Sequence, residues 1–535
     1  MNKKTITLIL TTLLAVMGVK ADVIPSSYYS EPAQGTFYIY NVTEGKFLMT
    51  AGISENNNAL QTNPQAVTLT SNSDGTYKFS GNAGCFVKIG HFKGMWLWPS
   101  GTDTNVLSWT FNVEGTKTYK ISATTTSTVS ENGGTKEPGT YYIINEGNLG
   151  DKDDAANAGV YALITEASYY SYIASTTATI PASFYTTTIT AGTYYLYNTY
   201  TNCFLCDGNN YAGLSSTPET ITITATGDNY YIQVSDGGYL HYSDQGKDLG
   251  NTWADNTSDQ TWNFESFHGA TGLFTVKNVT NNLYLYAYSS GPANKGAQLW
   301  GTVDSNKYAW ALISTTDYET NVTLNDTENF SPANDIFAAN VTVNRAMTAN
   351  VWNTLVVPFD MAIPSGWTVK EPTAFDGSTL TFGDASSIVA GKPYIVKPTE
   401  AVTSFSATNV TLKKDLANTE VGDVTMKGTY EYIDAIDHNS QTSYVVGLKN
   451  GATSLYKVNS AVSLKPFRAY FTVSGNNPGA RVAIRFDDDT TGINVLEEES
   501  ANENTGMKDG KYLENGRIII VKNGVKYSTN GQIAK

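Results

Sequence analysis

The feature that most constrains this chain is a repeated unit of strand, turn and strand. Each copy reads as a strand of alternating character, an Asn or Gly turn, and a second short strand ending in Leu or Val. A unit of this size cannot bury its apolar face alone, so several copies must close on one another. The copies begin at Gly35, Gly192, Gly227 and Gly272, with a weaker fifth at Asp74.

Two further stretches of similar sequence divide the copies into two blocks. The stretch "VYALITEASYY" from Val160 and the stretch "AWALISTTDY" from Ala309 each close a block that a Gly-Thr-aromatic-Tyr strand opens. The simplest account is two tandem modules, residues 35–168 and 190–316, of three repeats each. Three such repeats close into a six-stranded barrel capped by three hairpins, and a β-sandwich is the alternative architecture.

The second module resembles the ricin-type β-trefoil family. The shared pattern is Gly-x-Tyr-x-[Leu/Ile/Val]-x-Asn, a turn, Tyr/Phe-Leu, and a closing Gln-x-Trp, which Gln260 and Trp262 supply. Trp109 and Trp310 keep the Trp of this closing motif without its Gln. The resemblance covers roughly half of the chain, and it implies a trefoil fold with a carbohydrate-binding role.

The positions that bind sugar in that family are not acidic here. The resemblance implies an Asp directly after the Leu of the second strand, where it would accept hydrogen bonds from ring hydroxyls. Asp207 comes one residue too late, and on a strand that shift turns a side chain to the other face. The motif therefore predicts a trefoil seam and not a sugar site. The implied positions hold Met49, Cys206 and His241, with Tyr284 and Tyr286 after the two Leu of the third repeat.

Other residues offer material for a carbohydrate platform. Flat aromatic rings can stack on the apolar face of a sugar, and Asn or Asp side chains can satisfy its hydroxyls. Each Trp has an alternative interpretation as a buried plug of the trefoil core. The candidate ligand-binding residues are Trp96 and Trp98, two apart in "GMWLWPSG"; Asp207, Asn209, Asn210 and Tyr211 in "CDGNNYAG"; and Gln298 and Trp300 in "AQLWG".

The C-terminal half changes character at about residue 319. Strand pairs with Gly-rich turns predict an antiparallel β-sandwich over residues 319–490. The pieces "WNTLVVPFD", "AGKPYIVKP" and "RAYF" resemble a module of secreted and cell-surface proteins of Bacteroidetes such as Bacteroides and Prevotella. That resemblance implies surface display and no particular reaction.

Two short segments follow the sandwich. Residues 491–508 are acidic and polar, which predicts a disordered linker. Residues 509–535 alternate strand-like runs with Asn-Gly turns, which predicts a small β-meander. This tail resembles C-terminal segments of exported proteins of the same bacteria, some of which serve as type IX sorting signals, although the order of its motifs departs from the commonest form.

The N-terminus predicts export. Residues 1–21 join a basic start, an apolar stretch and a small-residue cleavage site that ends at Ala21, which is the pattern of a secretory signal peptide. A membrane anchor is the alternative interpretation. No later apolar run is long enough to span a bilayer, so we expect a secreted protein or one on the outer cell surface.

Charge and motifs exclude several function classes. A net charge of -15 repels phosphate backbones, so we expect no nucleic-acid partner. The chain has no zinc-ligand spacing, nucleophile elbow or nucleotide-binding glycine motif, so we expect no metal and no cofactor.

The C-x-x-C of Cys203 and Cys206 is more consistent with buried small hydrophobes than with a redox or metal site. A calcium loop at Asp151, Asp153 and Asp154 lacks the EF-hand spacing, so a solvated turn is the simpler reading.

Together these features predict an all-β, non-catalytic protein that binds carbohydrate or mediates adhesion through trefoil loops. Its partner would be a host or dietary glycan, or another surface protein. The alternative is a structural or protein-binding surface component with no sugar site, and the missing Asp residues favour it. A catalytic pair of carboxylates distant in sequence is the third hypothesis.

Overall fold

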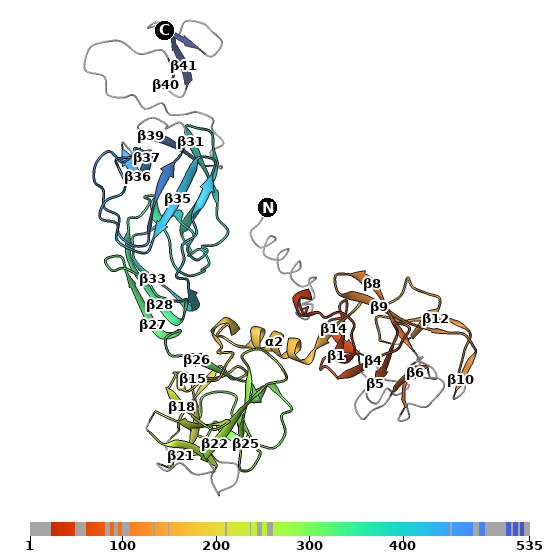
Figure 1. The fold of residues 1–535 in the computed structure, drawn as a ribbon. Coiled ribbons are helices and arrows are strands. Elements are labelled where there is room, and N and C mark those ends of the chain that lie inside the picture. The colour runs from red at the N-terminus through yellow and green to blue at the C-terminus, as the bar shows by residue number, and fades with distance from the viewer. Residues whose placement is uncertain are drawn as a thin grey trace, which may run out of the picture.

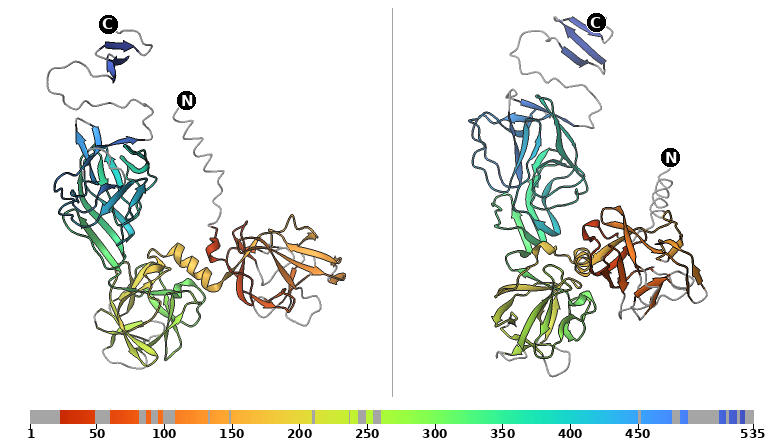
Figure 2. Two further views of the ribbon diagram at one scale, coloured as in Figure 1. Left: turned by 45° about the horizontal axis from the view of Figure 1, so that its top comes forward. Right: turned by 45° about the vertical axis from the view of Figure 1, so that its right-hand side comes forward.

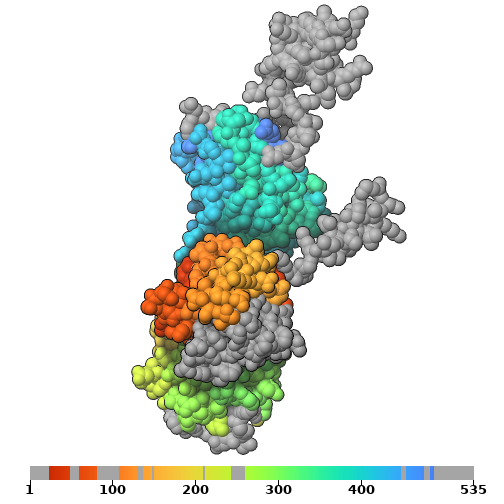
Figure 3. Space-filling model, turned by 90° about the vertical axis from the view of Figure 1, so that its right-hand side faces the viewer, coloured from red at the N-terminus to blue at the C-terminus, as the bar shows by residue number. Residues whose placement is uncertain are grey.

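The structure is a computed structural model, and it is almost entirely β (Figure 1). Two closed barrels and a sandwich follow one another along the chain, with a small sheet near the C-terminus. In the space-filling view the sandwich and the second barrel lie at opposite ends of the molecule, with the first barrel in front (Figure 3). The described residues are 23–48, 60–80, 86–89, 95–98, 108–131, 134–147, 149–208, 211–235, 237–242, 249–253, 260–449, 452–474, 481–486, 510–514, 517–522 and 525–528.

The first barrel, called module 1, is a closed ring of six strands in the order β1-β4-β5-β8-β9-β14. A hairpin extends from every second strand of the ring. The ring strands are β1 (Gly35–Asn41), β4 (Val67–Ser71), β5 (Tyr77–Ser80), β8 (Trp109–Gly115), β9 (Thr118–Thr125) and β14 (Tyr161–Thr165). The hairpin strands are β2 (Lys46–Leu48) with β3 (Leu60–Gln61), β6 (Phe86–Ile89) with β7 (Met95–Trp98), and β12 (Gly139–Ile143) with β13 (Leu149–Lys152).

The second barrel, called module 2, repeats this topology as β15-β18-β19-β22-β23-β26. Six ring strands capped by three hairpins are the β-trefoil arrangement, so both modules have the predicted fold. The ring strands are β15 (Gly192–Asn198), β18 (Ile221–Thr226), β19 (Asn229–Gln233), β22 (Thr261–Ser266), β23 (Phe274–Asn278) and β26 (Trp310–Ser314). The hairpin strands are β16 (Cys203–Asp207) with β17 (Ala212–Ser215), β20 (Tyr239–Tyr242) with β21 (Leu249–Trp253), and β24 (Tyr284–Ala287) with β25 (Ala297–Trp300).

Alternation along the strands explains the cores of both barrels. In β15 and β26, Leu196, Trp310 and Leu312 point inward and are fully buried. Trp262 is buried in the same core, and Trp109 fills module 1, where its ring stacks on Phe79 with centroids 5.1 Å apart. Closure is what buries these faces, because no single repeat contributes enough apolar surface alone.

The third repeat of module 1 has no counterpart among the copies found in the sequence. It runs from β9 to β14, and an extra hairpin of β10 (Val129–Glu131) and β11 (Gly134–Lys136) is inserted before its cap. This insertion separates the first strand of the repeat from the "GTYYI" of β12, so the spacing of the pattern is lost.

A single α-helix among the described residues, α2 (Glu166–Thr177), joins the two modules (Figure 2). The side chain of Thr165 caps its N-terminus by accepting a hydrogen bond from the backbone N–H of Ser168. Tyr169 packs edge-on against Phe47 of module 1, and Tyr170 stacks on His268 of module 2 with ring centroids 4.4 Å apart.

In the described part of the chain no helix has the length and apolar character needed to cross a membrane. The described 3-10 helices are η1 (Ser26–Tyr28), η3 (Ala182–Phe184) and η5 (Asn306–Tyr308).

The sandwich pairs a three-stranded sheet with a ten-stranded one. Its predicted antiparallel character needs one correction, because β27 runs parallel to β28 and β31 runs parallel to β39. A long connection separates the strands of the second pair, which allows the parallel crossover. The strands are β27 (Tyr318–Asn325), β28 (Ile336–Met347) and β33 (Val402–Leu412) in the small sheet, and β29 (Asn353–Leu355), β30 (Trp367–Phe375), β31 (Thr379–Asp384), β32 (Tyr394–Pro398), β34 (Thr419–Val421), β35 (Val424–Thr429), β36 (Ser443–Lys449), β37 (Ala452–Lys457), β38 (Arg468–Val473) and β39 (Arg481–Phe486) in the large one.

The C-terminal tail forms the predicted meander of three antiparallel strands. The predicted signal peptide at residues 1–21 and the predicted linker at residues 491–508 lie outside the described residues. The strands of the meander are β40 (Gly510–Glu514), β41 (Arg517–Lys522) and β42 (Val525–Ser528).

Candidate functional site

The outer face of the hairpin β24–β25 gathers aromatic side chains. Along β24 the residues Leu285 and Ala287 are fully buried in the barrel, so alternate positions face outward. Strand pairing then sets Tyr284 opposite Trp300 and Tyr286 opposite Gln298. We call this face, together with the neighbours described below, the aromatic surface. Its members are Tyr200, Tyr284, Tyr286, Tyr288, Gln298, Trp300 and Lys307.

Exposure distinguishes three members of this surface from the aromatic side chains of the cores, whereas Tyr284 and Tyr286 are half-buried against a buried cluster. Trp300 is 43% exposed, Tyr288 is 61% exposed and Tyr200 is 39% exposed. Among the described residues the one other aromatic side chain of comparable exposure is Tyr432, at 47%, in the sandwich. Three of the four exposed aromatic side chains among the described residues therefore belong to one hairpin and the turn beside it.

Lys307 joins Tyr200 to the hairpin. Its Nζ lies 5.7 Å from the ring centroid of Tyr200 and 5.4 Å from that of Tyr286, and it donates a hydrogen bond to the Tyr286 hydroxyl at 3.3 Å. The Tyr286 ring also packs on buried Tyr308, with centroids 4.9 Å apart. These contacts restrain the rings, so a ligand would meet aromatic faces that are already positioned.

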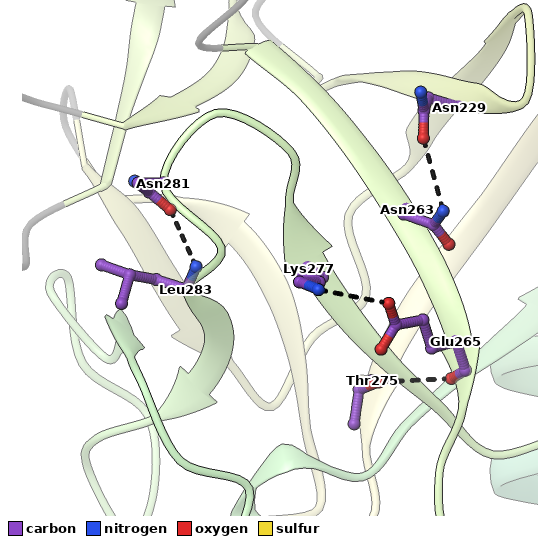
Figure 4. A network of polar contacts seen from close by, with 7 residues as sticks. All are labelled: Asn229, Asn263, Glu265, Thr275, Lys277, Asn281 and Leu283. Carbon is purple, nitrogen blue, oxygen red and sulfur yellow. Dashed lines mark hydrogen bonds and ion pairs between the residues drawn. The ribbon is translucent and has the colours of Figure 1, made fainter.

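A second lysine supports the other end of the hairpin (Figure 4). Lys277 lies 5.5 Å from the ring centroid of Tyr284 and 3.5 Å from a carboxylate oxygen of Glu265. The turn before β24 is held by Asn281, whose side-chain oxygen accepts a hydrogen bond from the backbone N–H of Leu283 at 2.9 Å (Figure 4). Lys277 beside the Tyr284 ring and the hydrogen bond to the backbone N–H of Leu283 together hold Tyr284 in place.

The chemistry available at this surface suits recognition of a ligand. Aromatic faces offer stacking area, while the Gln298 amide and the tyrosine hydroxyls offer hydrogen bonds in both directions. The seven residues of the aromatic surface include no carboxylate, thiol or imidazole.

The predicted loop after β16 has a different character. The ammonium of Lys295 lies 3.6 Å from the ring centroid of Tyr211, so one face of that ring is covered. Asp207 ends β16, and its backbone N–H donates to the Glu219 carboxylate at 3.1 Å. Asn209 and Asn210 lie outside the described residues, so only Asp207 and Tyr211 of this predicted group are described.

The remaining predicted residues fall in two places. Trp96 and Trp98 lie on β7, opposite Lys88 and Phe86 of β6, and their side chains lie outside the description. Gln260 and Trp262 are fully buried, and the Trp262 indole donates to the Leu240 carbonyl at 2.9 Å. Trp262 is therefore part of the core of module 2.

Module 1 contains a polar hollow of about 400 Å³ near the end of its third repeat. Asp154 lies in it, and hydrogen bonds from the side chain and backbone of Asn157 lower the pKa of that carboxyl. Asp153 points elsewhere, to the backbone N–H of Thr140. In the described part of the chain no three His, Cys, Asp or Glu side chains are arranged to hold a metal ion. The hollow is lined by Ile144, Asn145, Glu146, Gly150, Asp151, Asp154 and Asn157.

The cysteines of the C-x-x-C motif are both buried and free. Burial raises the pKa of the Cys206 thiol to about 12, with smaller contributions from Glu219 and Asp207. A thiol in this state is unreactive, which fits a packing role rather than redox chemistry.

Comparisons with known proteins return structures of single modules. No family model and no curated protein matches the chain. SeviL bound to asialo-GM1 saccharide is 15% identical, covers 24% of this chain and 99% of its own, and gives a TM-score of 0.20. The Macrolepiota procera ricin B-like lectin in complex with lactose is also 15% identical, covers 24% of this chain and 99% of its own, and gives a TM-score of 0.21.

A longer match is to a mosquitocidal holotoxin. It is 10% identical, covers 94% of this chain and 57% of the toxin, and gives a TM-score of 0.28. At these identities and TM-scores the comparisons place no ligand on this chain. The trefoil fold of the two modules rests on their own closed rings of strands.

Proposed function

We propose that this protein is a secreted or surface-displayed, non-catalytic glycan-binding protein, and that the aromatic surface of module 2 carries the binding site. The observation that supports the proposal most is the cross-strand pair of Tyr284 with exposed Trp300 on an outward face. Leu285 and Leu299 fill the barrel core at the same level, so the 43% exposed Trp300 ring lies outside that core, while Tyr284 is half-buried against a second buried cluster.

An energetic argument supports a ligand on this face. Open aromatic area lowers solubility and contributes nothing to folding, so a patch of this kind on an acidic, soluble surface indicates an interaction. Tyrosine and tryptophan combine stacking area with polar edges, which matches a ligand that has apolar faces and many hydroxyls. A second module in the same chain would raise a weak single-site affinity through avidity.

The test is a glycan array probed with the mature chain, residues 22–535, and with a Trp300→Ala variant. We expect the wild-type chain to bind a defined group of glycans and the variant to lose most of that signal. Tyr432→Ala is the matched control, because Tyr432 has similar exposure but lies in the sandwich. Binding that survives in Trp300→Ala would move the site to another part of the chain, and the β6–β7 hairpin with Trp96 and Trp98 would be examined next.

A protein-binding role without any sugar site is the second candidate. Trp and Tyr are also the residues that dominate protein interfaces, so the same surface fits a protein partner. An array without any binding by the wild-type chain, together with a partner whose capture requires Trp300, would favour this candidate over the first.

A further inference from the structure

We infer that the aromatic surface takes an extended glycan chain of at least three sugar rings that carries an acidic group, rather than one terminal neutral sugar. The inference rests on the proposed function and specifies its ligand class. It depends on two observations: the spacing of the outward residues along β24, and the ammonium group beside the middle of that row.

The outward residues form three successive levels. Tyr284, Tyr286 and Tyr288 occupy alternate positions, with Leu285 and Ala287 buried between them. A strand rises ~3.4 Å per residue, so neighbouring levels lie roughly 7 Å apart and the outer two roughly 14 Å apart. One pyranose ring spans a single level, so a single terminal sugar would leave most of the row uncovered.

The second strand gives each level a different partner. Trp300 lies opposite Tyr284 at the first level, Gln298 lies opposite Tyr286 at the second, and Tyr288 stands at the third, where its backbone N–H donates to the Gly296 carbonyl. Stacking groups thus occupy both ends of the row, and an amide lies near its middle. This order suits a chain whose outer rings stack while a central ring is held by hydrogen bonds.

Charge at the middle level points to the acidic group. The Lys307 ammonium lies beside Tyr286 and makes no ion pair with any described residue, while Lys277 is already paired with Glu265. The chain as a whole carries a net charge of -15, so a positively charged side chain without an ion-pair partner among the described residues stands out in this acidic protein. A carboxylate or sulfate on a central sugar would be complementary to Lys307, and the acidic remainder of the protein would disfavour a densely charged polyanion.

The test uses the mature chain on an array that contains neutral, uronate-containing, sialylated and sulfated oligosaccharides of one to six units. We expect binding to concentrate among acidic members of three or more units, with affinity rising about tenfold or more from one unit to three and then levelling, since the second and third rings add hydrogen bonds at the middle level and a stacking contact at the far end. The best acidic binder is then compared with its carboxyl-reduced or desulfated form. We expect the neutral form to bind the wild-type chain more weakly.

Variants at two positions, with a control at a third, connect the result to the structure. Lys307→Gln should remove the difference between acidic and neutral forms, whereas Lys307→Arg should keep it. Tyr288→Ala should lower the affinity for three-unit chains to that for two-unit chains, and Tyr432→Ala should change neither. Both mutated side chains lie at the surface, and unchanged hydrogen-exchange rates in β23 and β26 would show that the variants fold.

Three outcomes would overturn the inference. Equal affinity for one-unit and three-unit glycans would refute the extended chain, and indifference to loss of the acid would refute the role of Lys307. Both of these results leave the proposed glycan-binding function standing. An array with no binding at all would refute the proposed function together with this inference.

Discussion

The three Trp residues that close trefoil repeats differ in one hydrogen bond. Trp109, Trp262 and Trp310 are all fully buried. The indole N–H of Trp262 donates to the Leu240 carbonyl at 2.9 Å, and that of Trp310 donates to the Leu285 carbonyl at 3.0 Å. The indole N–H of Trp109 has no hydrogen-bond partner among the described residues. Replacing each by Phe therefore tests how much this bond contributes to stability.

Replacing Trp by Phe lowers the stability of the module through two effects, one common to all three positions and one confined to Trp262 and Trp310. At all three positions the smaller ring leaves a void, which destabilises the module by loss of contacts. At Trp262 and Trp310 it also leaves a buried carbonyl without its donor, which costs about 1–3 kcal/mol more. At Trp109 it removes a buried N–H that was already unsatisfied. We expect Trp109→Phe to be less destabilising than the other two by about 1–3 kcal/mol.

Hydrogen exchange followed by mass spectrometry is the suitable assay. A chain of several units does not unfold in one step, whereas exchange reports the opening free energy of each module from its own peptides. Peptides from β1 and β14 report on Trp109, and peptides from β15 and β26 report on Trp262 and Trp310. A Trp352→Phe variant in the sandwich is the control and should leave both modules unchanged. Equal losses at the three positions, or a larger loss at Trp109, would refute the reasoning.

Three further predictions concern other parts of the chain. Glu166→Gln should weaken the joint between the modules by at most about 1 kcal/mol, because the 3.0 Å contact of the Glu166 carboxylate with Nδ1 of His268 is partly exposed; a broader distribution of inter-module distances by fluorescence energy transfer would show it. Cys206, with a pKa of about 12, should resist alkylation at pH 8 in the native protein and react only after unfolding, and rapid native labelling would contradict this. Gly391→Ala should cost about 1–3 kcal/mol, since φ is +76° and the new Cβ would lie 2.7 Å from the Asp415 carbonyl; an unchanged melting temperature would count against it.

The sequence predicts the trefoil rings well because each repeat must bury the same face. The copies at Gly192, Gly227 and Gly272 fall at the three repeats of module 2. The third repeat of module 1 could not be found in this way, because the β10–β11 insertion separates its strands. The two parallel pairs of the sandwich were also missed, since the pattern of one strand does not reveal which distant strand lies beside it.

The candidate site was predictable only in part. Gln298 and Trp300 stand out in the sequence as polar and aromatic residues of one short strand. Tyr284 and Tyr286 were considered only as positions where the family has an acid, and their lack of a carboxylate argued against a site. Tyr200 and Lys307 come from separate turns, and only the closure of the barrel brings them to Tyr286.

The approximate threefold symmetry of module 2 makes the difference between its hairpins informative. All three hairpins turn alternate residues toward the core, so the same requirement for folding applies to each. In β16 the outward positions Phe204 and Cys206 are buried, and Phe204 packs against Tyr318 at the boundary with the sandwich. In β24 and β25 the outward Tyr284, Tyr286 and Gln298 are half-buried, the two Tyr against the same buried cluster as Phe204, whereas Trp300 is 43% exposed. Packing therefore accounts for the aromatic side chains of the first hairpin and for Tyr284 and Tyr286 of the third, and the exposed Trp300 and Tyr288 are the side chains for which we propose binding.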